Sequence, residues 1–348
     1  MTPAETVSAF YESLSRGERA GAEALMAPGF HWHGAHPVND LDGPDAFFTA
    51  WWEPLRSALP DVEYRPFVRV CGHYDGAAMD GDGAAGDWVN STGYLVGTFD
   101  APLFDIPATH RSLFLRFGEL VRVEDGKVAE GYIIPDFIDA MRQAGVCPLR
   151  PSVGARELIL PPLAMDGLDH CSDPAEGEAS LQLVRDMIDG LLRFDGKSLF
   201  TMDQERFWSP DFMWYGPAGI GSSRGLDGFR AHHQGPFLKA FPKRGVDRTK
   251  SLVAEGPYVA TGGWPHMTAS HLGGGWLGLP PSGKEVTMRV MDWWRREGDR
   301  LAENWVSIDI LHVLDQFGLD LFEQMRELAG DCSDFVGPAG EDLAQHRG

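Results

Sequence analysis

The sequence predicts two tandem α+β domains, in each of which helices come first and an antiparallel sheet follows. The chain has 348 residues, enough for two domains of roughly 100 to 200 residues. It contains an internal repeat, since the segments 30–60 and 212–242 align without a gap and the segments 113–145 and 286–318 align in the same order. In both copies, helical periodicity precedes strand-like runs, which is the order typical of α+β domains.

The repeat depends on identical residues at matching places. They include the pairs Phe30/Phe212, Trp32/Trp214, Gly34/Gly216, Gly43/Gly225, Asp45/Asp227, Arg116/Arg289, Glu130/Glu303 and Asp136/Asp309. Between the aligned blocks the first copy carries a Gly- and Asp-rich insertion over residues 72–87. A further block places Trp88 and Val89 over Tyr258 and Val259, and three collinear blocks in one order indicate duplication of one unit.

The elements of each copy follow in order. Apolar residues at three- and four-residue spacing predict an opening helix over 4–16 and again over 179–194. Asp45 and Asp227 are placed to cap a further helix after the first strand. Runs of β-type apolar residues then predict strands joined by DG or GD turns. We therefore expect domains at 1–147 and 179–328, with a Pro- and Gly-rich linker over 148–178 and a loose tail over 329–348.

Charge limits the partners. Thirty Lys and Arg face 51 Asp and Glu, a net charge of -21, which argues against nucleic acid and anionic membrane surfaces as partners. The first residues do not resemble a signal peptide, and no run approaches 18 uncharged apolar residues. Four cysteines without a CxxC pair predict no disulfide framework, so we expect a cytoplasmic protein.

The second copy resembles the closing half of the SnoaL-like polyketide cyclases, within the nuclear transport factor 2-like superfamily. The matching features are His271, the turn at 277–283, the Trp-x-x-x-Asp segment at 305–309 and the helix end at 316–318. The resemblance implies a cone in which a curved, mostly antiparallel sheet packs on about three helices around an apolar pocket. Family members often dimerise through their sheets, so it also implies an intramolecular pseudo-dimer, with a further homodimer left open.

The resemblance implies a general acid/base role for a late aspartate, and the matching positions are Asp309 and Asp136. A carboxyl in an apolar pocket has a raised pKa and can exchange protons near neutrality. Helix N-capping at a strand-to-helix junction explains an aspartate in this place equally well. His271 is the expected catalytic partner of Asp309, with His266 as the second candidate.

Further side chains are candidates for contact with a substrate. Of His232 and His233, one is expected to face the pocket, and Arg289 could hold an anionic group or form a surface ion pair. The expected pocket walls are Trp214, Tyr215, Trp264 and Trp305 in the second copy, with Trp32 and Tyr132 facing the first pocket.

Neither a metal nor a cofactor is expected. His232 and His233 are adjacent and lack the i, i+4 spacing of two ligands on one helical face. His31 and His33 share a strand face but have no positioned third ligand. No nucleotide-binding motif occurs in a credible context.

The leading functional hypothesis is a cofactor-independent cyclase, isomerase or lyase that acts on a small carbonyl-bearing substrate. The alternatives are a non-catalytic small-molecule binding protein and a hydrolase resembling limonene epoxide hydrolases. The hydrolase requires an Asp-Arg-Asp arrangement, which Arg289, Asp292 and Asp309 only outline.

Overall fold

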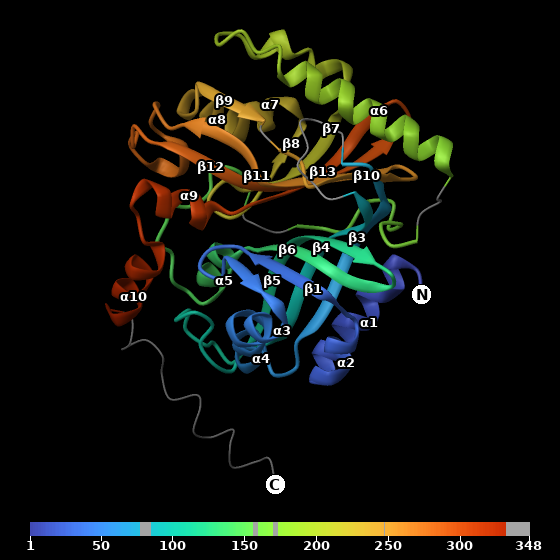
Figure 1. Ribbon diagram of the computed structural model, residues 1–348. Coiled ribbons are helices and arrows are strands. Elements are labelled where there is room, and N and C mark those ends of the chain that lie inside the picture. The colour runs from blue at the N-terminus through green and yellow to red at the C-terminus, as the bar shows by residue number, and fades with distance from the viewer. Residues whose placement is uncertain (77–84, 156–158, 170–172, 247, 332–348) are drawn as a thin grey trace.

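A computed structural model describes residues 1–76, 85–155, 159–169, 173–246 and 248–331. Figure 1 shows two halves one above the other, each with its own curved sheet. Residues 77–84 of the Gly- and Asp-rich insertion and residues 332–348 of the expected tail lie outside the described residues. Two tandem α+β units are confirmed.

The first half contains a six-stranded sheet in the order β2-β1-β6-β5-β4-β3, in which only β1 and β6 run parallel. Its helices are α1 (Pro3–Arg16), α2 (Arg19–Ala24), α3 (Gly43–Phe47), the π-helical turn η1 (Phe48–Trp52), α4 (Glu53–Ala58) and α5 (Phe137–Gln143). Its strands are β1 (Met26–Gly34), β2 (Asp40–Asp42), β3 (Glu63–Tyr74), β4 (Gly86–Thr98), β5 (Ser112–Glu124) and β6 (Lys127–Pro135).

The second half repeats this plan, with a sheet in the order β10-β11-β12-β13-β7-β8 and β9 paired to β11. Its helical elements are α6 (Pro174–Leu191), η2 (Leu199–Met202), η3 (Gln204–Arg206), α7 (Gly225–Phe229), the π-helical turn η4 (Arg230–Gln234), α8 (Gly235–Ala240), η5 (Trp276–Gly278), α9 (Ile310–Phe317) and α10 (Leu321–Asp331). Its strands are β7 (Trp208–Tyr215), β8 (Ser223–Arg224), β9 (Lys243–Val246), β10 (Ser251–Glu255), β11 (Tyr258–Ser270), β12 (Glu285–Glu297) and β13 (Arg300–Ile308).

Local sequence explains where the opening helices begin. Thr2 and Glu5 form a reciprocal capping box at the start of α1, and Gly17 ends that helix with a φ of 75°. Asp173 caps α6 by accepting a hydrogen bond from the Ala175 N–H, and Pro174 occupies the first turn. Helix α6 therefore begins within the stretch 148–178 that the sequence suggested as linker.

The two sheets pack against each other through their outer faces. The Trp293 indole N–H donates to the Asn90 carbonyl at 3.2 Å, and the Asn90 amide donates to Ser251 at 2.9 Å. A Cβ added to Gly118 would lie 2.7 Å from the Trp293 ring, so this glycine permits the close approach of β5 to the second half. Both faces of each central strand are consequently buried.

The segment that connects the halves packs against both. Tyr94 of the first half exchanges hydrogen bonds with the backbone of Ile159, and Trp305 of the second half donates to the Leu160 carbonyl at 2.8 Å. Within the described residues, no helix is both long enough and apolar enough to cross a membrane.

Candidate active site

The second half encloses a cavity of about 410 Å³ between its helices and the inner face of its sheet. This volume lies within the roughly 300 to 1,000 Å³ typical of small-molecule sites. Most lining side chains are apolar or aromatic; the polar and ionisable ones are Gln204, His233, Gln234, Arg244, Thr261, His266, Asp292 and Asn304.

Strand alternation decides which side chains reach the cavity. Along β12 the residues Met288, Val290, Asp292 and Trp294 line it. The intervening residues face the first half, as Trp293 does with its hydrogen bond to Asn90. Successive side chains of a strand point to opposite faces, so Asp292 stands in an otherwise apolar row.

Asp292 is the carboxyl group of this cavity. The Asn304 amide donates to one of its oxygens at 3.2 Å, and the side chain is only partly buried because it faces the cavity. Burial raises the pKa of Asp292 to about 7, because the single amide bond does not offset the loss of hydration. A carboxyl with this pKa can both take up and release a proton near neutral pH.

Two histidines share the cavity with Asp292. The His233 ring stacks on Trp214 with 4.3 Å between ring centres, and burial lowers the pKa of His233 to about 3. Its imidazole is therefore neutral at physiological pH. The Nδ1 atom of His266 lies 3.0 Å from the Arg248 carbonyl oxygen, which can only accept, so this nitrogen carries a proton.

The first half has a buried carboxyl at the matching place. Glu119 lies three residues after Arg116, just as Asp292 lies three residues after Arg289. Glu119 pairs with Ser91 of β4, and Asp292 pairs with Thr261 of the equivalent strand β11. Tyr11 donates to Glu119 at 2.5 Å, and Tyr64 donates to its other oxygen. Burial raises the pKa of Glu119 to about 7. The stacked rings of Tyr11 and Tyr64, 3.8 Å apart, pack directly at this carboxyl.

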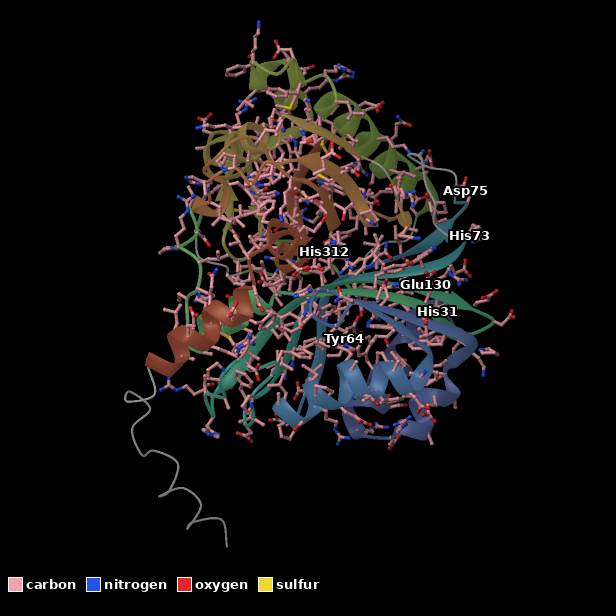
Figure 2. All side chains as sticks on the ribbon, turned by 60° about the vertical axis from the view of Figure 1, so that its left-hand side comes forward. His31, Tyr64, His73, Asp75, Glu130 and His312 are labelled. Carbon is pink, nitrogen blue, oxygen red and sulfur yellow. The ribbon has the colours of Figure 1, made fainter. Side chains whose placement is uncertain are left out.

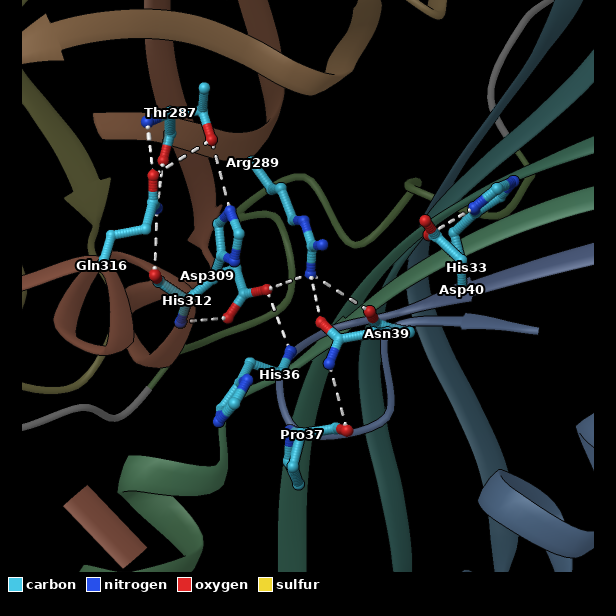
Figure 3. Close-up of polar contacts among 11 residues, drawn as sticks. His33, His36, Pro37, Asn39, Asp40, Thr287, Arg289, Asp309, His312 and Gln316 are labelled. Carbon is cyan, nitrogen blue, oxygen red and sulfur yellow. Dashed lines mark hydrogen bonds and ion pairs between the residues drawn. The ribbon is translucent and has the colours of Figure 1, made fainter. Parts of the chain in front are cut away.

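Asp309, the expected acid/base group, lies outside the cavity lining, where the two halves meet (Figure 3). One of its oxygens accepts the His312 N–H at 3.0 Å and caps α9, as the alternative interpretation predicted. The other accepts the His36 N–H at 3.0 Å and pairs with Arg289 at 3.0 Å. Both oxygens are thus engaged in structural contacts.

Asp136 and Arg116 form the mirrored contacts. Asp136 caps α5 through the Asp139 N–H and accepts the Ala218 N–H of the second half at 2.8 Å. Arg116 donates to the Gly216 carbonyl at 2.5 Å, and Arg289 donates to the matching Gly34 carbonyl at 3.4 Å. The aspartate and arginine that the repeat preserves therefore connect the two halves.

The remaining predicted site residues separate into two groups. Trp214, His233 and His266 line the cavity. His271 does not; it is fully buried against Phe317, with 4.3 Å between ring centres, and its Nδ1 lies 3.1 Å from Ser282. Tyr215, Trp264 and Trp305, which were expected as pocket walls, do not line this cavity, and neither does Arg289, which was expected to hold an anionic group or form an ion pair.

Those four residues face the other half or the connecting segment. Tyr215 stacks on Trp305 with 5.5 Å between ring centres, and the Arg289 guanidinium lies 4.3 Å from the Trp264 ring centre. His232 also lies outside the lining, with Nδ1 3.4 Å from Ser223, so His233 is the inward one of the histidine pair.

In the first half, Trp32 is enclosed by aromatic side chains. It packs on Phe10, Phe30 and Phe47, with ring centres 5.0 to 6.3 Å away. Tyr132 stacks on His33, with 4.4 Å between ring centres, and its hydroxyl donates to Glu130.

His31 and His33 each have a carboxylate partner. Their Nδ1 atoms lie 2.9 Å from Asp42 and 2.7 Å from Asp40, respectively. Figure 2 shows His31 and Glu130 together in the first half, whereas His312 lies where the halves meet. In the part of the chain that the structure describes, no group of three His, Cys, Asp or Glu is arranged to hold a metal ion.

The family comparisons agree with this architecture. The family described as SnoaL-like polyketide cyclase matches residues 201–317, and the family described as SnoaL-like domain matches residues 7–131. The chain is a tandem member of the SnoaL-like family. No curated protein matches this sequence.

Several solved structures are similar to part of the chain, each over less than half of its length. IdmH from Streptomyces antibioticus is 21% identical over 42% of this chain and 100% of its own, with a TM-score of 0.32. AclR from Streptomyces galilaeus is 25% identical over 41% of this chain and 86% of its own, with a TM-score of 0.33. An NTF2-like protein from Burkholderia thailandensis is 20% identical over 42% of this chain and 98% of its own, with a TM-score of 0.30.

Proposed function

We propose that this tandem SnoaL-like protein is a cofactor-independent acid/base enzyme of the cyclase, isomerase or lyase type. Its substrate is a small carbonyl-bearing compound that binds in the cavity of the second half. The observation that carries the proposal is Asp292, a carboxyl that faces this cavity and whose pKa burial raises to about 7. Carboxyl groups whose pKa is raised by an apolar pocket are characteristic of sites that transfer protons.

In the proposed reaction, the Asp292 carboxylate removes a proton from the carbon next to the substrate carbonyl and later returns it. The negative charge that develops on the carbonyl oxygen needs a hydrogen-bond donor. His233 suits this role, because its neutral imidazole lines the same cavity and provides one N–H. Asp309 and His271, the residues that the resemblance implied, have no part in this proposal, since neither lines the cavity.

The direct test is deuterium exchange at the α-carbon of a panel of aromatic ketones in D₂O, followed by NMR. The wild-type chain should accelerate exchange, with a rate that rises between pH 5.5 and 8 as Asp292 ionises. Asp292→Asn should lose about 100-fold or more of this rate, the usual size of a general-base contribution. Asp309→Asn should keep the rate per folded molecule.

The rival functions make different predictions. A binding protein would bind ketones without accelerating exchange, which would refute the catalytic proposal. For an epoxide hydrolase, Asp292 would have to meet Arg289 and Asp309, but Asp292 faces the cavity and the other two pair with each other where the halves meet. The arrangement thus gives the hydrolase no support.

We also infer that the chain forms an intramolecular pseudo-dimer in the cytoplasm, without a nucleic-acid or membrane partner. The net charge of -21 and the mirrored Asp136 and Asp309 contacts support this inference. Light scattering after gel filtration should give a mass near 38.3 kDa if no further homodimer forms.

A further inference from the structure

Arg244 places a positive charge at the cavity without a carboxylate partner. It lies on β9, and its side chain lines the cavity together with Phe194. The guanidinium donates to the Phe241 carbonyl at 3.3 Å and lies 5.5 Å from the Phe194 ring centre. Among the described residues, no Asp or Glu forms an ion pair with it.

This lack of a partner is unusual for the surroundings. The chain has 51 Asp and Glu against 30 Lys and Arg, so carboxylates are abundant. Of the lining residues, Arg244 alone has a permanent charge, since the other ionisable groups are His233, His266 and Asp292. Burial lowers the pKa of Arg244, which reflects the cost of removing the cation from water without an anion beside it.

Arg244 lies at the open side of the cavity. Its lining neighbours Leu192, Gly196, Pro242 and Gly245 are exposed to solvent, whereas Gln204, Trp208 and Met202 are buried. An arginine in this position can hold a planar anion through two parallel N–H groups while the rest of the ligand enters the apolar interior.

The strand register separates Arg244 from Asp292. Arg244 pairs with Ala269 of β11, which pairs with Val286 of β12. Asp292 lies six residues beyond Val286 on β12, about 20 Å along the strand at about 3.3 Å per residue, and β9 lies two strand spacings of about 4.8 Å from β12. The curvature of the strands and the length of the arginine side chain make the distance between the Arg244 guanidinium and the Asp292 carboxyl shorter than the distance between the two backbones.

We propose that Arg244 binds a carboxylate, so that the ligand of this cavity is an aromatic acid with its acid group at the mouth. This proposal rests on the proposed function for the identity of the site. It adds that the carbonyl carbon on which Asp292 acts lies away from the acid group. The apolar and aromatic lining receives the ring system.

Isothermal titration calorimetry with 2-naphthoate and 2-naphthamide tests the proposal, because the two ligands have similar shape and differ in charge. The wild-type chain should bind the acid about 10-fold more tightly, as a partly exposed charge-assisted pair allows. In Arg244→Gln this ratio should fall to about 1. Lys243→Gln removes a charge from the adjacent, exposed residue outside the lining and should keep the ratio.

Arg244→Lys provides a folded variant that retains the charge and should keep part of the preference. Equal binding of the two ligands by the wild-type chain would overturn the proposal. An equal loss of the preference for the acid in Lys243→Gln and Arg244→Gln would also overturn it, because the preference would then come from the long-range electrostatic field of several cations. Failure of both ligands to bind would also overturn it. Naphthoate has no exchangeable α-proton, so the ratio is independent of the exchange assay.

Discussion

Replacement of Asp292 by asparagine should stabilise the second half and should do so more strongly at higher pH. Burial raises the pKa of Asp292 from an ordinary value of 3.8 to about 7. At pH values between these two pKa values, the unfolded chain loses the proton of this carboxyl and the folded chain keeps it. The free energy of unfolding therefore falls as the pH rises, and it stops falling above about pH 7. A shift of about three pKa units lowers the free energy of unfolding by about 4 kcal/mol at pH 8, and the lowering at pH 5.5 is about 2 kcal/mol.

Urea unfolding followed by tryptophan fluorescence measures this effect at the two pH values. Asp292→Asn should gain about 4 kcal/mol at pH 8 and about 2 kcal/mol at pH 5.5, as upper limits. Asp299→Asn is the matched control, because the Asp299 side chain is 97% exposed and its removal should change stability little. A variant no more stable than the wild type at pH 8, or an equal gain at both pH values, would refute the reasoning.

Three further changes examine the first half and the contact between halves. Glu119→Gln should reduce the loss of stability between pH 5.5 and 8 in urea titrations, because burial raises the pKa of Glu119 from 4.5 to about 7. Asp309→Asn should cost about 3 to 5 kcal/mol in the same titrations by leaving Arg289 buried without its charged partner; an unchanged midpoint would contradict this. Gly118→Leu should lower the melting temperature and expose the connecting segment to protease, since its Cβ would lie 2.7 Å from the Trp293 ring; wild-type protease resistance would contradict it.

The fold could be predicted from the sequence because its signals are local and occur twice. Helical spacing and DG or GD turns are properties of short segments, and the repeat provides each of them independently. The expected capping by Asp45 and Asp227 is wrong, because both lie within the first turns of α3 and α7 and neither caps its helix. The expected start of the helix at 179 is wrong, because Asp173 and Pro174 form an N-cap signal within a stretch whose Pro and Gly content favours a linker.

The site was harder to predict because both faces of β12 are buried. A sequence pattern shows that Met288, Val290 and Asp292 share one face, but it does not show whether that face meets the cavity or the other half. The repeat preserved Asp309 and Arg289 because they connect the halves. Identity between copies therefore marks the contact between the halves and not the cavity.

The two buried carboxyls show what separates a structural acid from a candidate catalytic one. Glu119 and Asp292 occupy equivalent strand positions, and burial raises both pKa values to about 7. Two tyrosine hydroxyls occupy the oxygens of Glu119, so a substrate proton would have to displace them. Among the residues that the structure describes, Asp292 accepts only the Asn304 amide, and it faces a cavity of about 410 Å³. A raised pKa alone does not make a catalytic group, because the carboxyl must also be able to reach a substrate.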